Sequence, residues 1–235
     1  MQEEIVERLL AINRDFYLKF ATSFAETRAH PQPGFYQLIE FIPKPCKKML
    51  DVGCGEGRFG RFVLNRNLID QYTGVDFSQE IIDIAKDSMK GEFFLRELSR
   101  YGSLNGLGEF NLIVCLATMQ HIPGRSNRLN LLREMGTHLT AKGIIFLSNW
   151  QFLDSERQRR KVTDWSKVNI DPTKLEENDF LIAWQRDGTG FRYVNFINSD
   201  EMEWLAKSVG LNVSGQFRAD GQEGNLNLYS ILSTA

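Results

Sequence analysis

The first apolar residues of the chain recur at intervals of three and four positions. They are Ile5, Leu9, Ile12, Phe16 and Phe20. This spacing puts them on one face and predicts an amphipathic helix near the start of the chain. Pro31 and Pro33 then interrupt the pattern, because proline cannot continue a helix interior. A second short helix is expected over residues 36–42, before the first predicted strand.

From residue 47 the pattern alternates between apolar runs and amphipathic segments. The runs predict strands over residues 47–53, 71–77, 91–98, 109–119 and 143–150. Helices are expected between them over residues 57–67, 78–90 and 127–139, with Ser78 as an N-cap. Strands that alternate with helices are typical of a parallel sheet covered on both faces. The sequence therefore predicts an α/β, doubly wound fold.

Residues 151–191 do not follow this alternation. The segment is polar and contains "RQRRK", and long insertions in compact domains are often lids or binding loops. A helix over residues 199–210 and two terminal strands, 212–218 and 225–232, complete the pattern. We expect one domain: an N-terminal helical cap (1–45), a core (46–150), a lid-like insertion (151–191), and a C-terminal helix and strands (192–235).

Composition narrows the function classes. The 235 residues are 42% hydrophobic, enough for one sizeable core, and the net charge of −2 argues against a strongly basic nucleic-acid-binding protein. The three cysteines show no metal-ligand or disulfide spacing, so we expect no metal. The first ten residues do not have the pattern of a signal peptide, and no apolar run is long enough for a bilayer. We expect a cytoplasmic protein without a membrane partner.

The stretch "MLDVGCGEGRFGRFV", residues 49–63, carries the main chemical signal. Gly53, Gly55 and Gly57 follow a predicted buried strand and open a helix. Glycines there let the backbone turn sharply and approach a ligand closely. Asp76, 19 positions after Gly57, ends the second strand, where a carboxylate can accept hydrogen bonds from the hydroxyls of an adenosine ribose.

The spacing of the loop separates the candidate ligands. Dinucleotide sites prefer G-x-G-x-x-G, and a phosphate-binding Walker loop needs Gly-Lys-Ser/Thr, which does not follow here. Asp51 would repel a pyrophosphate but could receive an ammonium group. The ligand indicated is an adenosine with an amino-acid tail, S-adenosylmethionine. The alternative is a glycine turn that only packs helix on strand.

These segments resemble the successive motifs of class I S-adenosylmethionine-dependent methyltransferases. The phrases are "LDVGCGEGRFG", "YTGVDFS", "FNLIVCLATMQHI" and "GIIFLSNW". The resemblance implies a Rossmann-like methyltransferase fold with a mostly parallel seven-stranded sheet, an N-terminal helical extension and a lid-like insertion. It also implies a set of cofactor-binding residues: Asp51, Gly53, Cys54, Gly55, Gly57, Asp76, Phe77, Glu97, Leu98, Cys115 and Leu116. Asn111 stands where the family usually has Asp.

A narrower resemblance lies outside the core, to the tRNA wobble-uridine carboxymethyl methyltransferases. That family has a phrase like F-x-x-T-R-x-x-P-x-P after its first helix. The matching positions here are Phe24, Thr27, Arg28, Pro31 and Pro33. The segment "FLIAWQRDGTGFRYVNF" is similar to another family phrase, with Val194 and Asn195 replacing Tyr and His. Of the family's His-His pair only His121 is kept, since Gln120 replaces the first.

This resemblance implies methylation of a carboxylate on a modified uridine, with tRNA and a small activator protein as partners. A carboxylate is already nucleophilic at neutral pH, so such a site needs mainly to position it. Arg28 and Arg192 are the candidates for holding it. His121 would face the reacting methyl group, where it could orient the substrate or act as a base toward a hydroxyl. Trp165, Trp184 or Tyr193 could stack a base.

Two other functions remain open at this stage. One is a small-molecule O- or N-methyltransferase with the insertion as a lid over the active site. The other is a cofactor-binding subunit without catalysis, against which the complete glycine loop and Asp76 argue. Arg28 and Arg192 also have structural interpretations, as a residue near a helix end and an ordinary strand residue.

Overall fold

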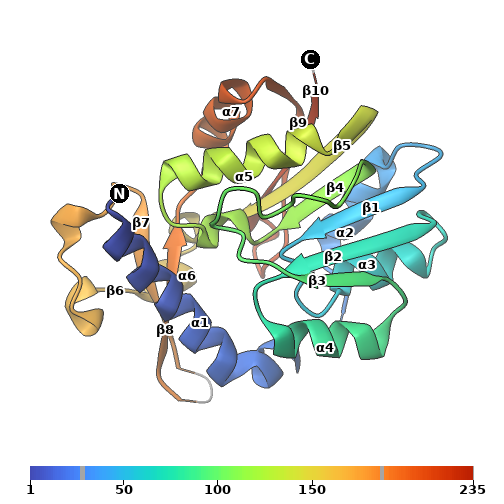
Figure 1. The fold of residues 1–235 in the computed structure, drawn as a ribbon. Helices are drawn as coiled ribbons and strands as arrows, with labels where there is room; N and C mark the ends of the chain where they lie inside the picture. Colours follow the sequence, from blue (N-terminus) through green and yellow to red (C-terminus); the bar gives the residue numbers. More distant parts are fainter. Residues whose placement is uncertain (27–29, 186–187, 235) are drawn as a thin grey trace.

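The computed structural model describes residues 1–26, 30–185 and 188–234. Its main feature is a seven-stranded sheet in the order β3-β2-β1-β4-β5-β10-β9 (Figure 1). The strands are β1 (Lys48–Val52), β2 (Gln71–Asp76), β3 (Glu92–Leu95), β4 (Phe110–Leu116), β5 (Leu139–Trp150), β9 (Leu211–Ala219) and β10 (Asn227–Thr234). β1 to β5 are parallel, and β10 pairs antiparallel with β5 and β9.

The sheet matches the doubly wound, mostly parallel fold expected from the sequence. The crossover helices are α3 (Arg58–Leu64), α4 (Gln79–Ser88), α5 (Arg125–Thr137) and α7 (Ser199–Ser208). Ser78 caps α4 by accepting a hydrogen bond from the backbone N–H of Ile81. Strand order reverses between β1 and β4, and in open α/β sheets ligands bind beyond the carboxyl ends of the strands at such a point.

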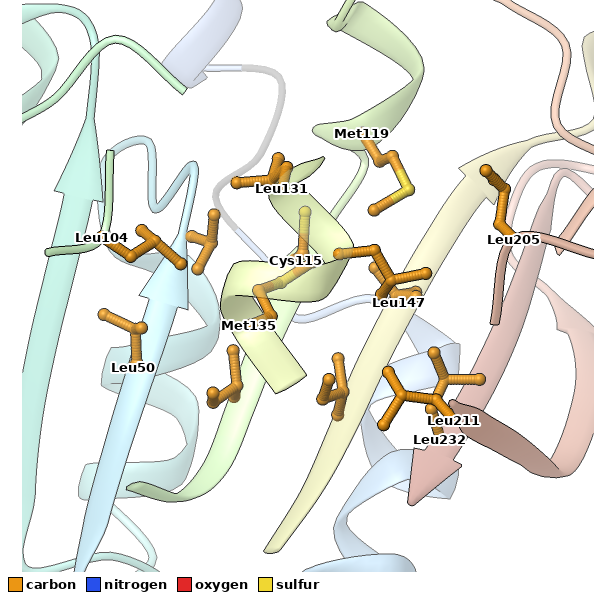
Figure 2. Close-up of a cluster of buried hydrophobic side chains, with 14 of the residues drawn as sticks. Leu50, Leu104, Cys115, Met119, Leu131, Met135, Leu147, Leu205, Leu211 and Leu232 are labelled. Atoms are coloured by element: carbon orange, nitrogen blue, oxygen red, sulfur yellow. The ribbon is translucent and has the colours of Figure 1, made fainter. Parts of the chain in front are cut away.

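Two apolar clusters cover the sheet. Residues of α5 and α7 pack on the central strands in the larger cluster, which Figure 2 shows around Leu147 and Leu232. A second cluster combines strand residues with α2 (Pro33–Leu38), the 3₁₀ turn η1 (Ile39–Phe41) and α3. Burial on both faces explains why β1 and β4 read as nearly continuous apolar runs in the sequence.

Helix α1 (Glu3–Glu26) runs alongside β8 (Gly190–Asn195), and it also contacts α4 (Figure 1). Its apolar stripe divides into two contacts. Ile5 and Leu9 pack with Ile170 and Tyr193, whereas Phe16 and Phe20 pack with Trp184. The amphipathic helix expected at the start of the chain therefore packs on the segment that follows β5.

That segment contains a small antiparallel sheet in the order β6-β7-β8. Its strands β6 (Val162–Thr163), β7 (Asp179–Trp184) and β8 are accompanied by α6 (Glu156–Arg159) and the 3₁₀ turns η3 (Phe152–Asp154), η4 (Trp165–Val168) and η5 (Pro172–Lys174). The boundary expected after residue 191 falls inside β8. Because β8 pairs with β7 along its whole length, the inserted unit continues to Asn195.

Asn13 joins α1 to the inserted sheet. Its side chain accepts a hydrogen bond from the backbone N–H of Tyr193 at 2.9 Å and donates one to the Tyr193 carbonyl at 3.2 Å. Asn13 is 4% exposed, so these bonds form away from water. Among the described strands, β8 is at the edge of its sheet, so the Asn13 side chain pairs with backbone groups that would otherwise be buried without a partner.

We expect Asn13→Ala to lower the free energy of unfolding by about 2 kcal/mol, because it leaves a buried backbone N–H without its acceptor. Urea denaturation measures this change. Asp15→Ala, at an exposed position on the same helix, is the matched control and should change stability by less than about 0.5 kcal/mol. Equal effects of the two substitutions would contradict the anchoring role of Asn13.

Candidate functional site

A pocket opens beyond the carboxyl ends of β1, β2 and β4. Its walls include the glycine loop, the ends of β2 and β4, and residues of α1 and α2. Ten of the residues expected from the sequence line it, namely Asp51, Gly53, Cys54, Gly55, Asp76, Phe77, Glu97, Leu98, Leu116 and His121. The pocket therefore brings together residues that are up to 70 positions apart in the chain.

The glycine loop has the backbone conformation that its composition requires. Gly53, Gly55 and Gly57 have φ of 76°, 55° and 74°, a region that side chains disfavour. A Cβ on Gly53 would lie 2.3 Å from the Thr118 side chain, whereas one on Gly55 meets nothing within 4 Å. Gly55 lines the pocket, so its open side is the place where a ligand can approach the backbone.

Asp76 holds the loop and faces the pocket. Its carboxylate accepts hydrogen bonds from the backbone N–H of Gly55 at 2.9 Å and of Ser78 at 3.1 Å. Burial raises the pKa of this carboxyl, and these backbone bonds act against the rise. Two acceptor oxygens at this position suit the two hydroxyls of a ribose.

Asp51 lies at the other side of the loop, 3% exposed, and accepts a hydrogen bond from the Tyr72 hydroxyl at 3.0 Å. Burial raises the pKa of Asp51 to about 7, although the hydrogen bond from Tyr72 acts to lower it. A cation beside a carboxyl group favours its ionised form. A buried carboxyl group whose pKa is raised is therefore stabilised by binding a cation.

This pKa predicts a pH-dependent affinity for a ligand with an ammonium group. Below pH 7 the Asp51 carboxyl holds a proton, so binding of the cation must release it, and affinity rises with pH. We expect S-adenosylhomocysteine to bind about tenfold more tightly at pH 8 than at pH 6, as measured by calorimetry. Asp51→Asn should flatten this dependence. A wild-type affinity that is equal at both pH values would contradict the ion pair.

Glu97 and Leu98 follow β3 and lie on the far side of Asp76 from the loop. One Glu97 oxygen accepts from the Ser99 hydroxyl at 2.9 Å, and the other pairs with Arg14 of α1 at 2.6 Å. Arg14 and Phe77 also line the pocket. The ion pair thus connects α1 to the end of the pocket that lies beyond Asp76 from the glycine loop.

His121 lies in the 3₁₀ turn η2 (Met119–His121) after β4 and lines the pocket. Its Nδ1 is 2.9 Å from the carbonyl oxygen of Tyr193. Because a carbonyl can only accept, Nδ1 carries the proton, and Nε2 of the neutral ring is an acceptor. The Tyr17 hydroxyl is 3.4 Å from Nε2. Ala117, with φ of 53°, turns the chain between β4 and this histidine.

Two residues expected to bind the cofactor lie outside the pocket lining. Cys115 is fully buried in the core cluster between β4 and α5, as Figure 2 shows, because its side chain points to the opposite face of the strand from the residues before and after it. Gly57 precedes α3, where a Cβ would lie 2.6 Å from the sulfur of Met89. The missing side chain of Gly57 thus allows the loop to pack closely against Met89, at the end of α4.

Of the two arginines expected to hold a carboxylate, the structure describes only Arg192. Arg192 is 5% exposed and does not line the pocket, because β8 turns its side chain into an aromatic layer. Its guanidinium lies over the rings of Phe16, Trp150 and Trp184 at 4.7, 4.8 and 5.5 Å. Arg192 therefore lies outside the lining of the described pocket, and substrate contact by this residue stays a prediction. Arg28 lies outside the described residues.

The suggested base-stacking residues also take structural positions. Tyr193 is fully buried and donates a hydrogen bond from its hydroxyl to Asp179 at 2.8 Å. Trp165 packs beside the Ile5 and Leu9 cluster, and Trp184 beside Phe16. None of the three lines the described pocket.

Several pocket residues lack a signal in the sequence. They are Leu10, Asn13, Arg14 and Tyr17 of α1, Gln32 and Phe35 near α2, and Arg58 and Trp150. The α1 residues recur at intervals of three and four, as an apolar stripe does, but two of them are polar. Polar residues inside a helical stripe are the signal that could have identified them.

The pocket fits S-adenosylmethionine. Gly55 leaves open space against the backbone, Asp76 offers acceptors for a ribose, and Asp51 offers an anion for an ammonium group. Within the described ranges, no cluster of three or more His, Cys, Asp or Glu has the arrangement of a metal site. No described helix has the length and apolar character that crossing a membrane requires.

Comparison with known proteins agrees with this fit. The chain matches the family described as "Methyltransferase domain" over residues 10–215. It is 29% identical over 189 residues to the mitochondrial ubiquinone biosynthesis O-methyltransferase of Saccharomyces cerevisiae, covering 79% of this chain and 54% of that protein. The chain thus spans about half the length of this curated relative.

Solved structures show the same fold. An S-adenosylmethionine-dependent methyltransferase from Clostridium acetobutylicum superposes with a TM-score of 0.68 at 17% identity, covering 93% of this chain and 99% of that one. One from Methanosarcina mazei gives 0.67 at 19% identity, covering 85% and 97%. Other structural neighbours hold S-adenosylmethionine or S-adenosylhomocysteine.

The family match covers most of the chain, the sheet has the topology of the structural neighbours, and the pocket offers the groups that the cofactor needs. The chain therefore belongs to the family described as "Methyltransferase domain" and has the fold of the S-adenosylmethionine-dependent methyltransferases compared above.

Proposed function

We propose that the chain transfers the methyl group of S-adenosylmethionine to a hydroxyl group of a small molecule. The observation that carries this proposal is the state of His121. Its Nδ1–H is held by the Tyr193 carbonyl at 2.9 Å, and the residue lines the pocket. Nε2 is therefore prepared to accept a proton from an acceptor placed beside it.

A hydroxyl acceptor needs such a base, whereas a carboxylate does not. A phenol or alcohol is mostly protonated at neutral pH and is a weak nucleophile until its proton leaves. When bound, the cofactor supplies an electrophilic methyl group. His121 would take the hydroxyl proton as the oxygen attacks, with Tyr193 holding the ring in position.

The surroundings of His121 also suit an aromatic acceptor. Trp150 lies edge-on to the imidazole with ring centroids 5.5 Å apart, and Tyr17 lies edge-on at 6.1 Å. Both residues and Ile122 line the pocket. Apolar and aromatic walls with one polar group are typical of small-molecule sites. The O-methyltransferase relative from Saccharomyces cerevisiae supports the same acceptor atom.

The wobble-uridine hypothesis has less support. Its two arginines are Arg192, which lies behind Trp150, and Arg28, which lies outside the described residues. Its aromatic stacking candidates are partly or fully buried in packing clusters. The net charge of −2 adds no attraction for RNA.

The proposal is tested with labelled S-adenosylmethionine and four acceptor classes: a catechol, a benzoate, an aromatic amine, and tRNA containing carboxymethyluridine. We expect label on the catechol, as a methyl ether identified by mass spectrometry. Transfer to the tRNA or the benzoate, with no transfer to the hydroxyl acceptor, would refute the proposal. Transfer only to the amine would still demonstrate methyltransferase activity, but it would exclude a hydroxyl group as the acceptor.

A further inference from the structure

The amino-acid tail of S-adenosylmethionine carries both an ammonium and a carboxylate group. Asp51 accounts for the ammonium group only. A carboxylate taken from water into a pocket needs a cation or several hydrogen-bond donors. The arginines in the described pocket lining are Arg14 and Arg58.

Arg14 is already engaged at the other end of the pocket. Its guanidinium is 2.6 Å from the carboxylate of Glu97, beyond Asp76 from the glycine loop. An anion at Arg14 would compete with this ion pair. Arg14 is therefore a poor candidate for the carboxylate.

Arg58 is placed differently. It is the first residue of α3, one position after Gly57, and its guanidinium lies over the Phe35 ring at 5.3 Å from the centroid. Among the described residues, its side chain makes no hydrogen bond or ion pair within the usual distance limits, although the charges of Glu56 and Asp220 act on it from farther away. Burial lowers the pKa of Arg58, and the negative charge of Glu56 acts against this change. Because the guanidinium is partly shielded from water, its electrostatic attraction to an anionic ligand is stronger than it would be at the surface.

We propose that Arg58 binds the carboxylate of the cofactor's amino-acid tail. The tail would lie with its ammonium group at Asp51 and its carboxylate at Arg58, both of which line the same pocket. The planar guanidinium can hold a carboxylate through two parallel hydrogen bonds. The Phe35 ring lies against one side of the guanidinium, and both residues line the pocket.

Calorimetry on wild type and Arg58→Met tests the proposal with two ligands. S-adenosylhomocysteine carries the carboxylate, whereas 5′-methylthioadenosine has the same adenosine without the tail. We expect Arg58→Met to weaken S-adenosylhomocysteine about 10- to 100-fold, the usual effect of losing a charge-assisted bond, and to leave 5′-methylthioadenosine within about twofold. Methionine keeps an apolar stem on Phe35.

Arg66→Met is the matched control, because Arg66 also lies over a phenylalanine ring, that of Phe62 at 3.9 Å, but outside the pocket. It should change neither affinity. If Arg58→Met lowered the affinity for both ligands equally, Arg58 would stabilise the loop and not bind the carboxylate, and the proposal would be overturned. An unchanged affinity for both ligands would overturn it as well. Arg58→Gln, measured with the same pair, serves if the methionine variant is unfolded. No acceptor is needed, so the result is independent of the proposed hydroxyl substrate.

Discussion

Replacing His121 with alanine should lower kcat for a hydroxyl acceptor about 10²- to 10⁴-fold, while the affinity for S-adenosylhomocysteine stays within about twofold. In the proposed reaction Nε2 would take the acceptor proton, whereas the glycine loop, Asp51 and Asp76 would hold the cofactor. Kinetics on the acceptor identified by labelled transfer, together with calorimetry, separate the two effects.

His138→Ala is the matched control for His121. His138 lies within hydrogen-bond distance of the carbonyl of Gly108 and does not line the pocket, so its loss should leave kcat unchanged. A His121→Ala variant that keeps wild-type kcat would exclude His121 as the base.

Replacing Asp76 with alanine should weaken S-adenosylhomocysteine at least about 100-fold. Two effects combine: the ribose loses its carboxylate acceptor, and the backbone N–H groups of Gly55 and Ser78 lose theirs. Because the loop and the ligand depend on the same carboxylate, this substitution should affect binding more strongly than any other in the pocket. Calorimetry or ligand-induced thermal stabilisation measures it.

Asp83→Ala provides the matched control for Asp76. Asp83 is an exposed carboxylate on α4 that pairs with Lys86 and Gln79, so its loss should leave cofactor affinity unchanged. If Asp76→Ala bound S-adenosylhomocysteine as wild type does, the ribose assignment would be wrong. Asp76→Asn, which keeps the shape of the side chain, separates loss of charge from collapse of the loop.

The sheet and the glycine loop could be predicted from the sequence because their signals are local. β1 and β4 are buried on both faces and read as apolar runs, and the glycines at 53, 55 and 57 occur where φ is positive. The role of Asp76 could be predicted because this residue ends the second strand of the strand-helix-strand unit that contains the glycine loop. Such features depend on neighbours in the chain, which a pattern of residues records.

The contribution of α1 could not be predicted in this way. Arg14 and Tyr17 reach the pocket only because α1 packs on β8, and Asn13 anchors that contact through the Tyr193 backbone. Periodicity identifies the helix but not the surface that it meets. The same tertiary contact explains Arg192, which is a plausible carboxylate ligand in the sequence and a buried cation among aromatic rings in the fold.

The inserted segment shows another limit of the pattern. Its polar composition predicts a break in the α/β alternation, which the structure contains, but not the antiparallel sheet β6-β7-β8. Short strands of two to six residues leave little periodicity to read. β8 also supplies the carbonyl of Tyr193, so the insertion sets which ring nitrogen of the neutral His121 carries the proton.

A crystal structure with S-adenosylhomocysteine bound tests the central claim most directly, namely that the pocket places the methyl donor beside His121. Methyl carbon and acceptor oxygen react from about 3–3.5 Å, and that oxygen must lie about 2.6–3.2 Å from the base. We expect the ligand sulfur within about 8 Å of His121 Nε2, and the Asp76 carboxylate at the ribose hydroxyls. A sulfur farther away, or an imidazole turned from the pocket, would contradict it.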